Sequence, residues 1–111
     1  MEEILYDRKT VEVHNERYYK MVLSYYLIEE EIAVEYCELK SYGIEIRKAA
    51  HFADEHTERE CKRISSLFFN REEAERFLEK IAKNKVTPIG LKDVVEDYAG
   101  RQVHAKRPAR V

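Results

Sequence analysis

The sequence predicts an α+β protein: an antiparallel, meander-like sheet of about five strands, followed by two C-terminal helices packed on one face of the sheet. Strand-like segments fill the N-terminal part of the chain, and two segments with helical spacing follow them. The 111 residues are 44% apolar and 38% charged, which is typical of a single folded domain. Only three glycines and two prolines interrupt the chain, so most of it is free to form regular elements.

The first strands lie between residues 3 and 28. Residues 3–13 alternate loosely between apolar and charged side chains, which predicts one strand or a hairpin that turns at residues 7–9. Residues 14–17 are typical of a turn. Residues 18–28 carry the strongest strand signal, because tyrosine and branched aliphatic side chains favour a pleated surface. Both side-chain sets of this strand are apolar, which indicates a central strand that is covered on both sides.

Three further strands are expected before the helices. The three glutamates at 29–31 indicate a solvated turn, and a partner strand should follow at 33–39. Residues 42–51 alternate in the pattern of a half-buried strand. A polar connection at 53–58 then leads to a last strand at 59–68.

Two helices end the predicted domain. Asn70 followed three residues later by Glu73 is typical of a capped helix start, and the apolar spacing continues to about Asn84. Residues 87–88, Thr-Pro, favour the start of the second helix, because proline needs no amide partner there. Gly100 is the expected end of this helix.

The charge is distributed unevenly along the chain. The formal net charge is −2, but residues 101–111 contain four cations and no acid, so the domain at 1–100 carries about −6. We expect 1–100 to form a single α+β domain and 101–111 to be a basic, disordered tail. The candidate contacts of this tail to an anionic partner are Arg101, Lys106, Arg107 and Arg110.

Cysteine content and hydropathy indicate the compartment. Cys37 and Cys61 are too few for a disulfide framework, and the N-terminus lacks the pattern of a signal peptide. The longest mostly apolar run, 21–28, is far shorter than the roughly 20 residues that a membrane span requires. We therefore expect a cytoplasmic protein with free thiols and no contact with a membrane.

Three segments in a fixed order resemble a known family. They are YYLIEEE at 25–31, YGIEI at 42–46 and TPIGLKDVVEDY at 87–98. Together they resemble a family of small uncharacterised bacterial proteins known only as a domain of unknown function. The resemblance covers roughly residues 18–98 and implies the same fold boundaries and a cytoplasmic location. It implies no activity, cofactor or catalytic residue.

The residue patterns that could carry chemistry are weak. His51, His56 and Cys61 are the nearest approach to a metal set, but spacings of five residues match neither a zinc knuckle nor a helical pair. Cys61 beside His56 is a poor thiolate pair, because proximity in sequence does not fix geometry. The scattered glycines form no phosphate-binding loop. We predict no catalytic residue, no metal and no cofactor.

A count of sheet faces gives the main functional hypothesis. Two helices can cover one side of the sheet, yet the strand at 18–28 is apolar on both sides. A large apolar side chain left in water forgoes roughly 1.5–3 kcal/mol. The side that bears Val22, Tyr26 and Ile28 is therefore the candidate partner or dimer face, or the opposite side if the helices cover this one. Either the N-terminal segment closes over it as a partial barrel, or another chain covers it; a small-ligand pocket is a third arrangement.

We accordingly expect a non-enzymatic protein-binding or regulatory module that acts through this apolar, tyrosine-rich face, with a protein partner or as a homodimer. One alternative is a nucleic-acid-associated accessory protein that uses the basic tail, and another is a small-ligand binder. Nucleic acid is the weaker candidate, because phosphate neutralisation dominates such binding and the domain itself is acidic.

Overall fold

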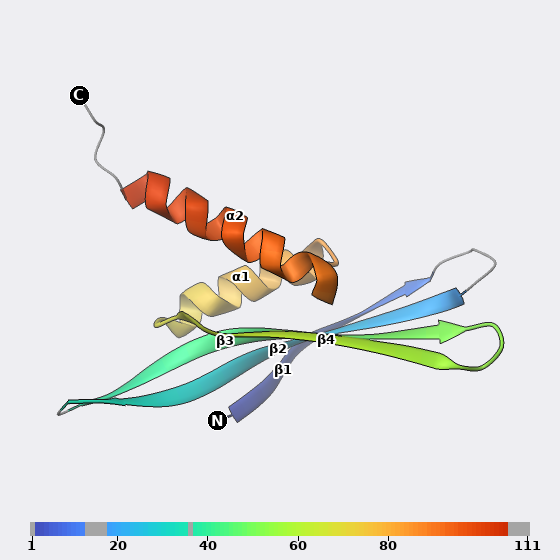
Figure 1. Ribbon diagram of the computed structural model, residues 1–111, viewed down its shortest axis with the longest axis horizontal. Helices are drawn as coiled ribbons and strands as arrows, with labels where there is room; N and C mark the ends of the chain where they lie inside the picture. Colours follow the sequence, from blue (N-terminus) through green and yellow to red (C-terminus); the bar gives the residue numbers. More distant parts are fainter. Residues whose placement is uncertain (1, 13–17, 36, 107–111) are drawn as a thin grey trace.

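The computed structural model describes residues 2–12, 18–35 and 37–106 (Figure 1). It confirms the predicted fold class: an antiparallel sheet is followed by two C-terminal helices that pack on one of its faces. The elements are β1 (Glu2–Glu12), β2 (Tyr18–Val34), β3 (Cys37–Phe52), β4 (Thr57–Phe68), α1 (Arg71–Lys83) and α2 (Pro88–Lys106).

The four described strands form one meander in the order β1-β2-β3-β4, with every neighbouring pair antiparallel. The N-terminal strand is single and contains a register shift between Leu5 and Asp7 in place of the hairpin that residues 7–9 could have formed. The turn predicted at 29–31 is wrong, because β2 continues to Val34 and pairs with Cys37 at the start of β3. The strand expected at 33–39 is thus divided between β2 and β3.

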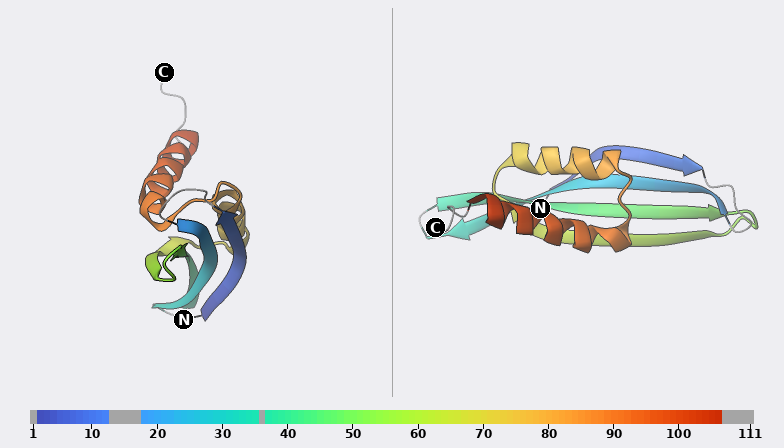
Figure 2. Two further views of the ribbon diagram at one scale, coloured as in Figure 1. Left: turned by 90° about the vertical axis from the view of Figure 1, so that its right-hand side faces the viewer. Right: turned by 90° about the horizontal axis from the view of Figure 1, so that it is seen from above.

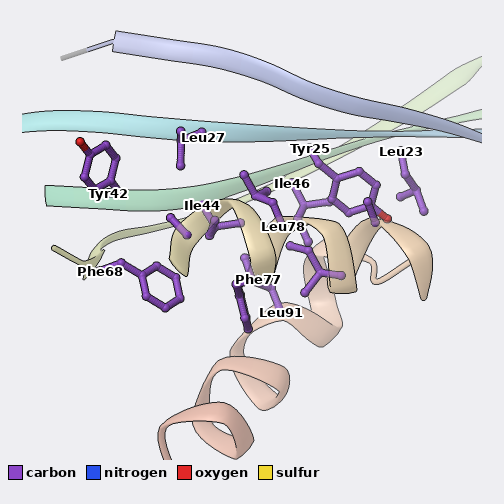
Figure 3. Packing of buried hydrophobic residues seen from close by; sticks show 13 residues of the cluster. Leu23, Tyr25, Leu27, Tyr42, Ile44, Ile46, Phe68, Phe77, Leu78 and Leu91 are labelled. Carbon is purple, nitrogen blue, oxygen red and sulfur yellow. The ribbon is translucent and has the colours of Figure 1, made fainter. Parts of the chain in front are cut away.

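Both helices cover the same face of the sheet. Figures 1 and 2 show α1 and α2 on one side of the strands, with α2 over β3 and β4. The β2 side chains Leu23, Tyr25 and Leu27 point into this layer, where all three are buried (Figure 3). The rest of the buried cluster comes from β3, β4 and the helices: Tyr42, Ile44, Ile46, Phe68, Ala74, Phe77, Leu78, Ile81, Ala82 and Leu91.

Specific polar contacts fix the helices to the sheet. The Tyr25 hydroxyl donates to the Val86 carbonyl oxygen at 2.9 Å, which ties β2 to the loop between the helices. The predicted helix start is confirmed, because the Asn70 side chain accepts a hydrogen bond from the Glu73 amide at 3.1 Å. Tyr98 of α2 donates to a Glu73 carboxylate oxygen at 2.8 Å and so holds α2 against α1.

The second helix is longer than the sequence predicts. α2 continues past Gly100 to Lys106, so the predicted helix end at Gly100 is wrong. The structure offers nothing within 4 Å of a Cβ at Gly100, and the residues after it, RQVHAK, contain several good helix formers. The last part of the predicted tail, 107–111, lies outside the described residues.

The second face of the sheet is open. The N-terminal segment forms the edge strand β1 and the sheet is not closed into a barrel, so this segment does not fold over the face opposite the helices. Neither helix lies on this face either (Figures 1 and 2). We call it the open face.

Candidate binding surface on the open face

The predicted face residues lie on the open face. Val22, Tyr26 and Ile28 alternate along β2 with the side chains that are buried under the helices, so they point the other way. Their exposure differs. Val22 and Tyr26 are half-buried, whereas Ile28 is 0% exposed and is unavailable to a partner.

The chain itself fills the open face around Ile28. Ile28 pairs with Gly43, and a register shift in β4 brings its backbone close above that glycine. A Cβ at Gly43 would lie 2.5 Å from the Ile64 carbonyl oxygen. Beside it, the buried hydroxyl of Ser41 shares a hydrogen bond of 3.1 Å with Ser66. This end of the face therefore needs no second chain to cover it.

A network of four charged residues occupies the middle of the open face. The buried Glu45 carboxylate accepts from Arg47 Nε at 2.5 Å and from Arg63 Nε at 2.8 Å. Both arginines also pair with Glu3 of β1, so the network ties β1, β3 and β4 together across β2. Hydrogen bonds from Arg47 and then Arg63 hold the pKa of Glu3 below its usual value. The Arg47 guanidinium also lies 4.1 Å from the ring centroid of Tyr26.

Sequence reasoning missed this network. Alternation within YGIEIR does place Glu45 and Arg47 on one face, which was the only local signal. Glu3 and Arg63 join them only through the register of the folded sheet. As a result, the face is far more polar than its tyrosine and aliphatic content predicts.

A groove lies beside the network, toward the end of the sheet at which β1 is followed by β2 and β3 is followed by β4. It encloses about 500 Å³. Its floor is made of the small or medium side chains Val22, Ser24 and Ala49, which lie in neighbouring positions of β2 and β3. Short side chains leave the hollow that long ones would fill. The wider lining also includes Tyr26, Arg47, His51 and Cys61.

Two arginines flank this floor. Arg8 comes from β1, opposite Ser24, and Arg59 comes from β4, opposite Ala49. Arg8 Nε donates to the Ser24 hydroxyl at 3.3 Å, but neither Arg8 nor Arg59 forms an ion pair with any residue that the structure describes. Each therefore keeps charged donors for another group.

The metal-like residues of the sequence are not brought together. His51 shares a 3.0 Å hydrogen bond with the Thr57 hydroxyl, whereas His56 stacks on Phe52 and contacts Asp54. Cys61 lies opposite Arg47, farther along β4. Within residues 2–12, 18–35 and 37–106, the structure contains no group of three or more His, Cys, Asp or Glu side chains that could hold a metal ion.

The two cysteines are free and exposed. Partial desolvation, followed by the nearby Glu45 carboxylate, raises the pKa of the Cys61 thiol, which disfavours the thiolate. Of the candidate tail cations, Arg101 and Lys106 belong to the α2 backbone, while Arg107 and Arg110 lie outside the described residues. Neither described helix combines the length and the apolar character that crossing a bilayer requires.

Comparison with known proteins gives a family but no activity. The chain belongs to a family of unknown function, DUF6514, which it matches over residues 2–101. This match runs from β1 through most of α2 and confirms the resemblance seen in the three sequence segments. No curated protein and no solved structure matches the chain.

Proposed function

We propose that this chain is a non-enzymatic protein-binding module that acts through the open face and takes a carboxylate-bearing segment of a protein into the groove. One observation carries the proposal. Arg8 and Arg59, which have no ion-pair partner among the described residues, stand on either side of a partly apolar floor. Positive charge around an uncovered hollow is the arrangement that an acidic segment complements.

The chemistry of the flanking residues favours carboxylates. A guanidinium presents a planar set of donors that matches a carboxylate, and charge-assisted hydrogen bonds of this kind are roughly twice as strong as neutral ones. Val22 and Ala49 offer apolar surface between the two charges. The groove could thus bury an apolar side chain of the bound segment while the arginines fix the orientation of its carboxylates.

The spacing of the two arginines favours an extended segment. They lie on the outer strands β1 and β4, three strand spacings apart across the sheet and two residues apart along it, so their Cα atoms are separated by about 16 Å. In an extended chain, carboxylates four residues apart are separated by about 13 Å. The long arginine side chains cover the remaining few ångströms, so a segment that crosses the strands could reach both arginines.

The charge of the surroundings favours a protein over a nucleic acid. Glu3, Glu45 and Glu60 lie on or beside the same surface, and residues 1–100 carry about −6. A phosphate backbone would meet these acids along with the arginines. A short acidic peptide carries only a few charges, so it can place its carboxylates at the arginines and avoid the glutamates.

We place this module in the reducing cytoplasm. Cys37 and Cys61 are both free and exposed, and two exposed thiols would be oxidised in a secretory compartment. This proposal is independent of what the groove binds.

Fluorescence anisotropy tests the proposed function. A labelled, short peptide in which glutamate alternates with valine is titrated with the wild-type chain and with Arg8→Gln and Arg59→Gln. We expect each substitution to weaken binding about tenfold or more, because a hydrogen bond to a charged group contributes about 1.5–3 kcal/mol.

Arg71→Gln is the matched control, since it removes an arginine on α1 that pairs with Glu75. It should bind the peptide as the wild type does. Equal affinity in all variants would refute the proposal. Tighter, Arg59-dependent binding of an oligonucleotide would assign the groove to nucleic acid instead.

A further inference from the structure

A two-stranded ribbon extends beyond the four-stranded part of the sheet. β1 pairs with β2 only as far as Glu29, and the pairing of β4 with β3 ends at Tyr42. The described residues of 30–41 therefore pair only with each other, from Glu30 with Ser41 to Val34 with Cys37. We call residues 30–41 the arm, which projects from one end of the molecule in Figure 1. An isolated two-stranded ribbon is marginally stable in water, so the arm would gain from a partner.

The composition of the arm is opposite to that of the groove. The arm contains four glutamates and one lysine, Lys40, whose Nζ already lies 3.7 Å from a Glu29 carboxylate oxygen. It also has an apolar centre, because Ile32 pairs with Leu39 and 43% of Leu39 is exposed. By the alternation of β2 and β3, this pair lies on the same face as Tyr26 and Glu45. The arm is thus an acidic ribbon with an apolar patch on the open face.

We propose that the groove is occupied by the arm of a second copy of this chain, in a dimer that pairs open face to open face with antiparallel long axes. This inference rests on the proposed function and names the protein that supplies the acidic segment. In the dimer, Glu30 of each arm, which shares the open face with Ile32, lies over Ser24 of the other copy and faces the neighbouring Arg8. The pair of Ile32 and Leu39 then lies on the floor formed by Val22 and Ala49.

The geometry of one copy allows this exchange. The arm and the groove lie on one face, separated along β3 by the distance from Leu39 to Ala49. At ten residues this distance is about 33 Å. A two-fold axis midway between them makes both contacts equivalent, as a symmetric interface requires. Each copy then covers the ribbon that the other leaves exposed.

The two native cysteines report on this arrangement. Cys37 lies in the arm and Cys61 lines the groove, and both are exposed. Cys61 is opposite Arg47, ten residues along β3 from Cys37. Within one copy they are thus about 33 Å apart. In the proposed dimer, Leu39 lies over Ala49, so Cys37 of one copy lies over His51 of the other, about 13 Å along the sheet from Cys61.

Cross-linking of mixed variants tests the dimer. Cys37→Ser and Cys61→Ser are each treated with a bismaleimide whose reach is about 13 Å, alone and mixed in equal amounts, and the products are separated under denaturing conditions and mapped by mass spectrometry. Each thiol adds across one maleimide double bond, so no oxidant is needed and no group is released. We expect the mixture to form a dimer joined through Cys37 and Cys61, well above the level in either variant alone. A mixture that gives no more dimer than the separate variants would overturn the inference.

Sedimentation velocity provides an independent readout that does not depend on cysteine. We expect Leu39→Glu to raise the dissociation constant of the dimer at least about tenfold, because it places a charge in the apolar contact. Ile89→Glu is the matched control, since Ile89 is an exposed aliphatic side chain on the helix side. A wild-type chain that sediments as a monomer at all concentrations would also overturn the inference.

Different results would refute the dimer and the proposed peptide binding. If the wild-type chain is monomeric but binds the glutamate–valine peptide through Arg59, the inference is wrong and the proposed function stands. The Leu39→Glu monomer leaves the groove free. If this variant does not bind the peptide, the proposed function is wrong whatever the oligomeric state.

Discussion

Replacing Gly43 with alanine should destabilise the fold strongly. A Cβ at this position would lie 2.5 Å from the Ile64 carbonyl oxygen and 2.8 Å from the Ser65 Cα. The first contact is about 0.9 Å closer than an ordinary van der Waals approach of 3.4 Å. Both atoms belong to the backbone of β4, so no side chain can turn aside, and the strand itself must move away from β3.

The expected loss is at the upper end of the range for overpacking. Such changes typically cost 1–3 kcal/mol, and the preference of a strand for alanine over glycine offsets roughly 0.5–1 kcal/mol. We therefore expect Gly43→Ala to lower the free energy of unfolding by about 2–2.5 kcal/mol. With a urea m-value of about 1–3 kcal/mol/M, the unfolding midpoint should fall by roughly 0.7–2.5 M.

Gly90→Ala is the matched control for this prediction. Gly90 lies inside α2, and the nearest atoms to an added Cβ are 3.8 Å away. Alanine should fit there and raise stability by up to about 1 kcal/mol through its helix propensity. The two substitutions are followed by circular dichroism in urea. A Gly43→Ala variant as stable as the wild type would refute the close approach of β4 to β3.

Four further substitutions test other parts of the structure. Tyr25→Phe removes the hydrogen bond to the Val86 carbonyl and should cost about 1–2 kcal/mol in urea unfolding. Burial and then Asp7 raise the pKa of Tyr25 to about 12, so the alkaline absorbance of the wild type should contain a late-titrating tyrosine that this variant lacks. Glu3→Gln should lower the urea midpoint most above pH 4.5, the ordinary pKa of this carboxyl, because ionised Glu3 stabilises the fold. The difference from the wild type should vanish as the pH falls through the lowered pKa of Glu3. A difference that grew as the pH fell would contradict this. Leu78→Ala should cost about 2–5 kcal/mol, whereas Phe69→Ala, at a side chain 68% exposed, should leave the thermal midpoint nearly unchanged.

Local sequence signals predicted much of the fold correctly. The alternation of residues 18–28 separated Val22 and Tyr26 from Leu23, Tyr25 and Leu27, because side-chain direction in a strand follows directly from position, although it did not decide which set the helices cover. The Asn70 cap was equally local, since its donor lies three residues away. Each of these features depends on neighbours in the sequence.

The errors came from long-range pairing. The glutamates at 29–31 suggested a turn, but they stay in β2 because Tyr42, Ser41 and Lys40 of β3 pair with them. Charged side chains on an exposed strand stay in water, so forming the strand costs them no solvation. The end of α2 was missed for a similar reason, since nothing near Gly100 stops the helix.

The candidate binding surface was only half predictable. Its position on the second face followed from counting apolar faces, but its chemistry did not. Arg8 and Arg59 are 51 residues apart in the sequence and come to one groove only through the register of four strands. The burial of Ile28 likewise depends on the irregular path of β4.

The central claim is that the open face binds a carboxylate-bearing protein segment. An NMR titration of the labelled chain with the glutamate–valine peptide tests it most directly. We expect saturable shift changes at Arg8, Val22, Ala49 and Arg59, with the amides of α1 unchanged. Shift changes confined to the helices, or none at any peptide concentration, would contradict it.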